Sequence, residues 1–235
     1  MKGVEGYYKL KGGVIINLIL LSLVSILPGI LWVWYFYRQD KYDPEPTNLI
    51  IRDFLWGIVI VLPASLLESP FGGYVTPQTP LLILFLSTIF VVGLVEEGLK
   101  SYTVYRLHYN HPDFDEPVDG IIYGVTVGLG FAAFENLVYA TLFGLSVGLS
   151  RAVLTSLAHA SFTGIFGYYL SKAKEKQDRS LIWFGFVLVT FFHGLYDFLV
   201  IGGFITTFYT IIIIVALQLY LASLIRNTTE RSPFK

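Results

Sequence analysis

Cysteine is absent from the 235 residues of this chain, and charged side chains make up only 14% of them. Without cysteine the chain can form no disulfide, no thiolate metal ligand and no cysteine nucleophile. The net charge is −1 and the Lys and Arg residues are scattered over short loops, which argues against nucleic-acid binding. Any chemistry must therefore come from His, Asp, Glu, Ser or Lys side chains.

Long apolar runs are abundant where charge is scarce. Hydrophobic residues make up 54% of the sequence and the mean hydropathy is +0.65, values typical of an integral membrane protein. Seven apolar segments are long enough to cross a bilayer as helices, at roughly 14–37, 49–68, 81–107, 119–144, 151–171, 180–200 and 204–225. The sequence predicts one all-α domain over residues 1–235, a polytopic transmembrane helix bundle of about seven spans.

The distribution of basic residues predicts an orientation. The loop after the fifth span contains Lys172, Lys174, Lys176 and Arg179, and most other Lys and Arg residues fall on the same side of the membrane as this loop. The positive-inside rule then places this loop and the C-terminus in the cytoplasm and the N-terminus outside. The lysines at 2, 9 and 11 oppose this orientation.

The third span contains three ionisable residues, Glu96, Glu97 and Lys100. Each charge near the centre of a bilayer costs about 2.5–3.5 kcal/mol on insertion scales, so such residues indicate a functional site with polar partners. Lys100 follows Glu96 by four residues, the favourable helical spacing for an ion pair. We therefore expect Glu96 to pair with Lys100 and Glu97 to face a reacting water.

Partners for these charges lie at similar depths in three other spans. Glu135 is in the fourth span, His159 in the fifth, and His193 and Asp197 in the sixth, where they are one helical turn apart. The fourth span also has glycines at 120, 124 and 128, a spacing that clears one helix face for a close neighbour.

The order and spacing of these motifs resemble one protein family. The set Glu96-Glu97-x-x-Lys100, Phe131-x-x-x-Glu135-Asn136, His159 and His193-x-x-x-Asp197 is similar to the PrsW family of membrane proteases, within the superfamily of CAAX prenyl endopeptidases and bacteriocin-processing proteins. A loop from Tyr37 to Pro46, with Asp40 and Glu45, looks like a loop of the same family. The resemblance covers residues from about Tyr37 to Phe198.

The resemblance implies a multi-pass peptidase of a prokaryotic cell membrane that cuts a membrane-anchored protein or peptide, in the best-known case an anti-sigma factor. The candidate catalytic residues are Glu96, Glu97, Glu135, His159, His193 and Asp197. In the broader superfamily His stands where this chain has Glu135, and Asn or a similar residue where it has Asp197. This difference makes a metal site more plausible here.

Two versions of the hydrolysis fit the residues. In one, Glu97 or Glu96 activates water without a metal, and Asp197 orients His193. In the other, His159 and His193 bind zinc or another divalent metal with one or two of Glu97, Glu135 and Asp197. The sequence leaves both open, together with the oligomeric state.

Other functions are less well supported. Buried carboxylates and histidines could also serve a proton- or cation-coupled transporter, but the chain has no internal repeat. The zinc-protease motif His-Glu-x-x-His does not occur, and Gly144-x-Ser146-x-Gly148 lacks the strand that a nucleophile elbow requires. The loop between the third and fourth spans has acidic and His residues that could in principle bind a metal, but no ligand spacing recurs among them and we interpret them as solvated: His108, His111, Asp113, Asp115 and Glu116.

Overall fold

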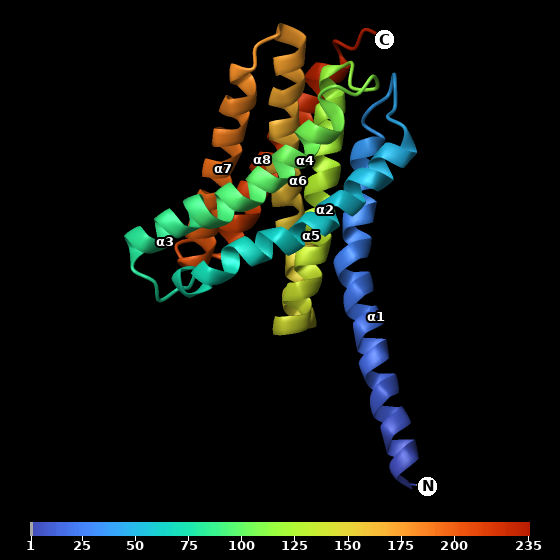
Figure 1. Ribbon diagram of the computed structural model, residues 1–235, viewed down its shortest axis with the longest axis vertical. Helices are drawn as coiled ribbons and strands as arrows, with labels where there is room; N and C mark the ends of the chain where they lie inside the picture. The colour runs from blue at the N-terminus through green and yellow to red at the C-terminus, as the bar shows by residue number, and fades with distance from the viewer. Residues whose placement is uncertain (1) are drawn as a thin grey trace.

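A computed structural model describes the backbone of residues 2–235 and the side chains of residues 18–235. Residues 2–235 contain no β-strand, and their helices make seven long passes (Figure 1). The predicted all-α bundle is therefore confirmed. The side chains of residues 14–17 and of the lysines at 2, 9 and 11 lie outside the described part. The elements are α1 Lys2–Tyr37, α2 Thr47–Glu68, η1 Ser69–Tyr74, α3 Leu81–Ser87, η2 Thr88–Gly93, α4 Leu94–His108, α5 Pro117–Phe143, α6 Leu145–Lys176, α7 Ser180–Ile201 and α8 Thr207–Thr229.

Helices α5 and α6 form the centre of the bundle, with α7 and α8 on one side and α1 along the other edge (Figure 1). The glycines of α5 explain their close packing. A Cβ atom on Gly124 would lie 2.4 Å from the carbonyl oxygen of Thr163 on α6, and one on Gly128 would lie 2.6 Å from that of His159. The predicted close approach at this glycine face is confirmed, and its partner is α6.

The third pass is interrupted in its middle. It comprises α3, the π-helical segment η2 and α4, and it lies obliquely across α5 and α6 together with α2 (Figure 1). Short π-helical segments inside a helix shift the angular phase of the residues that follow and are frequent at functional sites. Here Glu96 and Glu97 fall on the first turn of α4, directly after this segment.

Six of the passes within the described residues are long and apolar enough to cross a membrane, and α6 is the exception. Large apolar side chains point outward on many of them, as lipid-facing surfaces require: Leu66, Leu82 and Trp183 are each about 70% exposed. The middle of helix α6, residues 156–167, is buried among its neighbours, so this part of the helix does not need a lipid-facing apolar surface.

The structure corrects one boundary. Helix α6 begins at Leu145 and not near residue 151, because the chain reverses at Gly144 alone, with φ +93°. This left-handed conformation favours glycine.

The bundle has two distinct ends. The loops 38–46 and 109–116, the α6–α7 turn and the C-terminus lie at one end, uppermost in Figure 1. The α5–α6 turn and the segment around η1 lie toward the other. We call the first the C-terminal end of the bundle, the end expected in the cytoplasm.

Candidate active site

Glu97 is brought beside His193 by contact between two glycines. A Cβ atom on Gly93 would lie 2.6 Å from the carbonyl oxygen of Thr190 on α7, and one on Gly194 would lie 2.5 Å from the Cα atom of Ile89. The backbones of η2 and α7 therefore touch. This contact places Glu97, one helical turn after Gly93, within hydrogen-bonding distance of His193, the residue before Gly194.

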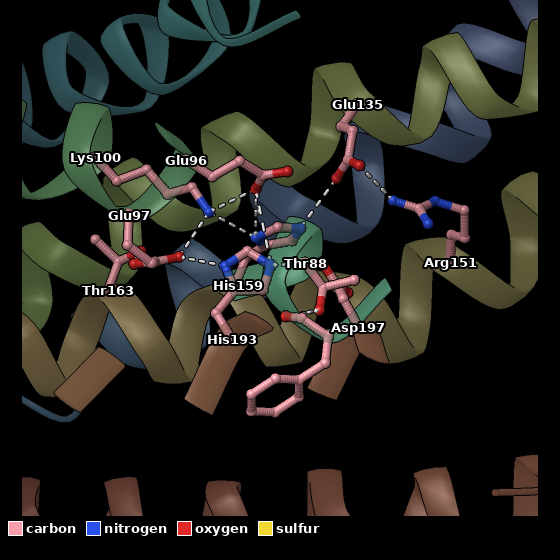
Figure 2. A network of polar contacts seen from close by, with 11 residues as sticks. Thr88, Glu96, Glu97, Lys100, Glu135, Arg151, His159, Thr163, His193 and Asp197 are labelled. Carbon is pink, nitrogen blue, oxygen red and sulfur yellow. Dashed lines mark hydrogen bonds and ion pairs between the residues drawn. The ribbon is translucent and has the colours of Figure 1, made fainter. Parts of the chain in front are cut away.

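Lys100 links both glutamates to a histidine. Its Nζ atom donates to Glu96 Oε2 at 3.0 Å, to Glu97 Oε1 at 2.8 Å and to His159 Nδ1 at 2.8 Å (Figure 2). It also lies 4.3 Å from the centre of the Phe131 ring. All three hydrogens of the ammonium group thus have an acceptor, which a fully buried lysine requires.

The hydrogen bonds of His159 define which ring nitrogen carries its proton. An ammonium group can only donate, so Nδ1 of His159 accepts from Lys100. Its Nε2 therefore carries the proton and donates to Glu135 Oε2 at 3.0 Å. Glu96 Oε2, the other acceptor of Lys100, lies 3.7 Å from Nδ1.

His193 is held in the same way by the other glutamate of α4. Its Nδ1 lies 2.9 Å from Glu97 Oε1, which already accepts from Lys100, so Nδ1 is the donor. Its Nε2 faces Asp197 Oδ2 at 3.5 Å and Glu96 Oε2 at 3.9 Å. The ring stacks on Phe162 at 5.2 Å and stands perpendicular to the His159 ring.

The far side of the network ends in an arginine. Arg151 Nη2 lies 2.8 Å from Glu135 Oε1, and the guanidinium group lies 3.7 Å from the centre of the Tyr139 ring. Figure 2 shows Glu135 between Arg151 and His159. Glu135 is therefore charge-compensated and oriented at the same time.

A cavity of about 610 Å³ lies beside this network. Its walls are formed by residues of α2, η1, η2, α4, α5, α6 and α7. Apolar residues such as Val61, Val138 and Leu142 form much of its wall. Its polar lining consists chiefly of Glu68, Glu96, Glu135, Arg151, His159, His193 and Asp197. An apolar cavity with a few converging polar groups is the usual form of a substrate site.

The side chains facing this cavity can hold a metal ion. Glu96, His159 and His193 are buried, and each offers one ligand atom within 4.8 Å of the others. Two imidazole nitrogens and a carboxylate oxygen form a donor set that suits zinc. Each imidazole has its other nitrogen bonded to a carboxylate, the arrangement that orients metal-binding histidines.

The structure brings the six candidate residues predicted from the sequence, Glu96, Glu97, Glu135, His159, His193 and Asp197, into one connected group. The positions of the two glutamates differ from our expectation. Glu96 lines the cavity, whereas Glu97 is fully buried and does not. Lys100 forms ion pairs with both glutamates, whereas we expected it to pair with Glu96 alone.

Sequence reasoning missed two charged residues of the cavity. Arg151 begins the predicted fifth span, yet it is the seventh residue of α6. Glu68 was taken as the end of a span, yet its side chain lines the cavity. Arg151 could have been identified as the partner of Glu135, because a carboxylate buried in a span needs an opposite charge and Arg151 stands at the start of the next span.

The loop after α4 is also not wholly solvated. His108 is fully buried, with Nε2 2.5 Å from Asp53 Oδ2, and its ring stacks on Tyr123 at 3.5 Å. Glu116 is only 4% exposed. Asp115 remains exposed, as predicted.

Comparison with known proteins gives one consistent result. The family model described as PrsW family intramembrane metalloprotease matches residues 45–221. Similar proteins named Protease PrsW occur in Geobacillus kaustophilus (36% identical, over 77% of this chain and 80% of the relative), Bacillus subtilis (35%, over 74% and 80%) and Clostridioides difficile (32%, over 78% and 79%). No solved structure matches the chain. These similarities do not favour the alternative of an ion-coupled transporter. The chain belongs to the PrsW family of intramembrane proteases, and it is a multi-pass membrane peptidase of bacterial type.

Proposed function

We propose that this chain hydrolyses a peptide bond in a membrane-anchored protein, with His159, His193 and Glu96 holding a divalent metal ion such as zinc. The observation that carries the proposal is the matched orientation of the two imidazoles. Each donates one ring N–H to a carboxylate and turns its other nitrogen toward Glu96. A metal ion bound there supplies Lewis acidity and activates a water molecule.

In this proposal the two other glutamates act through the imidazoles. Glu97 holds the proton of His193 at Nδ1, and Glu135 holds that of His159 at Nε2. Both carboxylates are themselves fixed, one by Lys100 and the other by Arg151. They keep the other ring nitrogen of each imidazole turned toward Glu96, which would raise metal affinity.

Lys100 and a metal ion compete for the same atoms. Its ammonium group is bonded to Glu96 Oε2 and His159 Nδ1, two atoms of the proposed donor set. Glu97 Oε1 is its third partner and is outside that set. With these two atoms bound to a metal ion, Lys100 would keep Glu97 as its counter-charge.

We assign proton transfer to Asp197. Its side chain is 20% exposed, against 6% for Glu96, and it lines the cavity beside His193. A carboxylate in this position accepts a proton from the attacking water and returns it to the leaving amine. Without a metal, Glu96 would be the base for the same water, and metal analysis distinguishes the two versions.

The proposed substrate is a protein anchored in the bilayer. The cavity wall contains many apolar side chains, which suits the end of a transmembrane segment, and the polar groups converge at its base. The family resemblance makes an anti-sigma factor the first substrate to test. The cavity extends to η1 and Ile201, toward the end of the bundle expected outside the cytoplasm.

The test uses purified protein in lipid nanodiscs, with bound metal measured by mass spectrometry and cleavage measured on membrane-anchored peptides. We expect His193→Ala to lose metal and cleavage, and Asp197→Asn to keep metal but lose cleavage. Glu175→Gln, a change at an exposed surface residue, is the control and should keep both. Unchanged cleavage after complete metal removal would refute the metal-dependent version. Wild-type cleavage by both His193→Ala and Glu96→Gln would refute the site itself.

A further inference from the structure

A second group of buried carboxyl groups lies at the C-terminal end of the bundle, away from the cavity. Asp40 comes from the loop that joins α1 to α2, and Glu116 and Asp119 come from the start of α5. Asp119 precedes Glu135 by sixteen residues, so the two lie about 24 Å apart along α5. This group is therefore separate from the proposed active site.

The three side chains converge. Asp40, Glu116 and Asp119 are 3%, 4% and 1% exposed, and each offers a carboxylate oxygen within 4.8 Å of the others. Glu45, from the same loop as Asp40, is also buried and approaches Asp119. Four acidic side chains from two loops are thus packed together at one end of the protein.

Several of these oxygens have no hydrogen-bond partner. Neither carboxylate oxygen of Asp40 is hydrogen-bonded, and Oδ1 of Asp119 and Oε1 of Glu45 are also unpaired. The other oxygen of Asp119 accepts from the backbone N–H groups of Asp115 and Glu116, at 2.8 and 2.7 Å, and thereby caps α5. The other oxygen of Glu45 accepts from the hydroxyl group of Tyr123.

The charge of the group is not compensated by basic residues. None of the ion pairs among the described side chains includes Asp40, Glu45, Glu116 or Asp119. Lys174, which lies nearby, donates instead to the backbone carbonyl group of Phe114 at 2.5 Å.

The electrostatic cost of this arrangement is visible at Asp40. Burial, with the nearby carboxylate groups of Glu116 and Asp43, raises the pKa of Asp40 to about 7. The backbone amides of Tyr42 and Asp43 lower this pKa only in part. Burial and the charge of Asp119 likewise raise the pKa of Glu45, to about 10.

We propose that Asp40, Glu116 and Asp119 bind a hard divalent cation, calcium or magnesium, which joins the loop 38–46 to the start of α5. Unpaired carboxylate oxygens from separate loops are the ligands that these cations prefer. The donor set contains no nitrogen, in contrast to that of the proposed active site, so the two sites should select different metals.

The alternative is that protons, and not a metal ion, neutralise the group. The two cases predict opposite effects of Asp40→Asn. If Asp40 takes up a proton, its raised pKa stabilises the fold below about pH 4, and this stabilisation is lost as the pH rises to about 7. Removing the charge would then stabilise the protein at pH 8. If a cation is bound, the same substitution removes a ligand and destabilises the loaded protein.

The experiment measures thermal unfolding of the full chain in detergent at pH 8. The protein is first stripped with EDTA, and calcium chloride or magnesium chloride is then added against KCl of equal ionic strength. We expect a saturable rise of several degrees in unfolding temperature with one of the two cations. Asp40→Asn and Glu116→Gln should each abolish the rise. If one of these variants does not fold, the other still tests the proposal. Asp113→Asn, the same charge change at a side chain 42% exposed in the adjoining loop, should retain it.

A further variant separates this site from the active site. His193→Ala removes a proposed zinc ligand, and the response to calcium or magnesium should persist in it. If neither cation stabilises the wild-type protein, or if Asp40→Asn raises the unfolding temperature in the presence of both, the proposal is wrong. It is also wrong if His193→Ala abolishes the response while Asp40→Asn and Glu116→Gln retain it.

Discussion

At the scale of single residues, Lys100 is the cation on which the two glutamates of α4 depend. Its ammonium group is fully buried and contacts both carboxylates. Removing one partner from a buried ion pair costs about 3–5 kcal/mol, because a charge is left without compensation. A metal ion at the same position can replace the lysine electrostatically.

This competition gives the first prediction. Lys100→Met should lower the unfolding temperature of metal-free protein and increase the affinity for zinc, because the competing ammonium group is gone. Thermal unfolding with and without zinc, and zinc titration by calorimetry, measure the two effects. Lys176→Met, at an exposed lysine, is the control and should change neither. Zinc affinity equal to or below that of the wild type would contradict the proposed donor set.

The two neighbouring glutamates give the second prediction. Glu97→Gln should weaken zinc binding by about 10–100-fold, because Glu97 orients His193 without contacting the metal. Added zinc should then restore part of the cleavage. Glu96→Gln removes a ligand facing the cavity, and added zinc should not restore its activity. If added zinc restores cleavage in Glu96→Gln and not in Glu97→Gln, then Glu97 is the metal ligand and Glu96 the orienting residue.

At the scale of helices, the glycine face of α5 sets the position of His159. A Cβ atom on Gly128 would lie 2.6 Å from the carbonyl oxygen of His159, and one on Gly120 would lie 2.3 Å from that of Gly167. The two glycines are eight residues apart, so only Gly128 packs against the site. Separation of α5 and α6 at this point would move an imidazole.

The third prediction follows from that difference. Gly120→Ala and Gly128→Ala should both reduce stability, by about 1–3 kcal/mol, because each overfills a tight contact. Only Gly128→Ala should also weaken zinc binding. Gly73→Ala is the control, since its added Cβ atom would meet nothing within 4 Å. Equal loss of zinc affinity in both α5 variants would show a general effect of misfolding instead.

The helices were largely predictable from the sequence, because a bilayer requires about twenty apolar residues for each span. The depths of Glu96, Glu135, His159 and His193 were predictable for the same reason, since residue number along a span converts into depth. The angular direction of Glu96 and Glu97 was not, because the segment η2 changes the helical phase just before them. No residue pattern in the sequence indicated that segment.

Contacts between distant loops were also beyond the sequence. Glu116 and Asp119 are acidic residues beside a span, a pattern that ordinarily indicates solvent. Their burial depends on the loop that carries Asp40, more than seventy residues earlier in the chain. Such packing is decided by the tertiary arrangement of α1, α2 and α5, and local composition does not report it.

At the scale of the whole molecule, the orientation in the membrane gives the fourth prediction. The chain has no cysteine, so single cysteines can be introduced without background labelling. Lys176→Cys should react with an impermeant thiol reagent only from the cytoplasmic side, and Gln78→Cys only from the outer side. Both positions are exposed. Labelling of both from one side would contradict the seven-pass orientation.

The position of the cavity also sets a geometric requirement on any protein that is cut. Glu135 lies eight residues before the end of α5, so the polar groups of the site are about 12 Å below that end of the bundle. An extended chain covers this depth with about four residues, at roughly 3.3 Å each, whereas a helix needs about eight. An unwound substrate end therefore reaches the depth of the histidines with about half as many residues as a helical one. Helix-breaking residues near the membrane surface of a substrate are therefore expected to favour its cleavage, because they shorten the stretch of chain that has to enter the cavity.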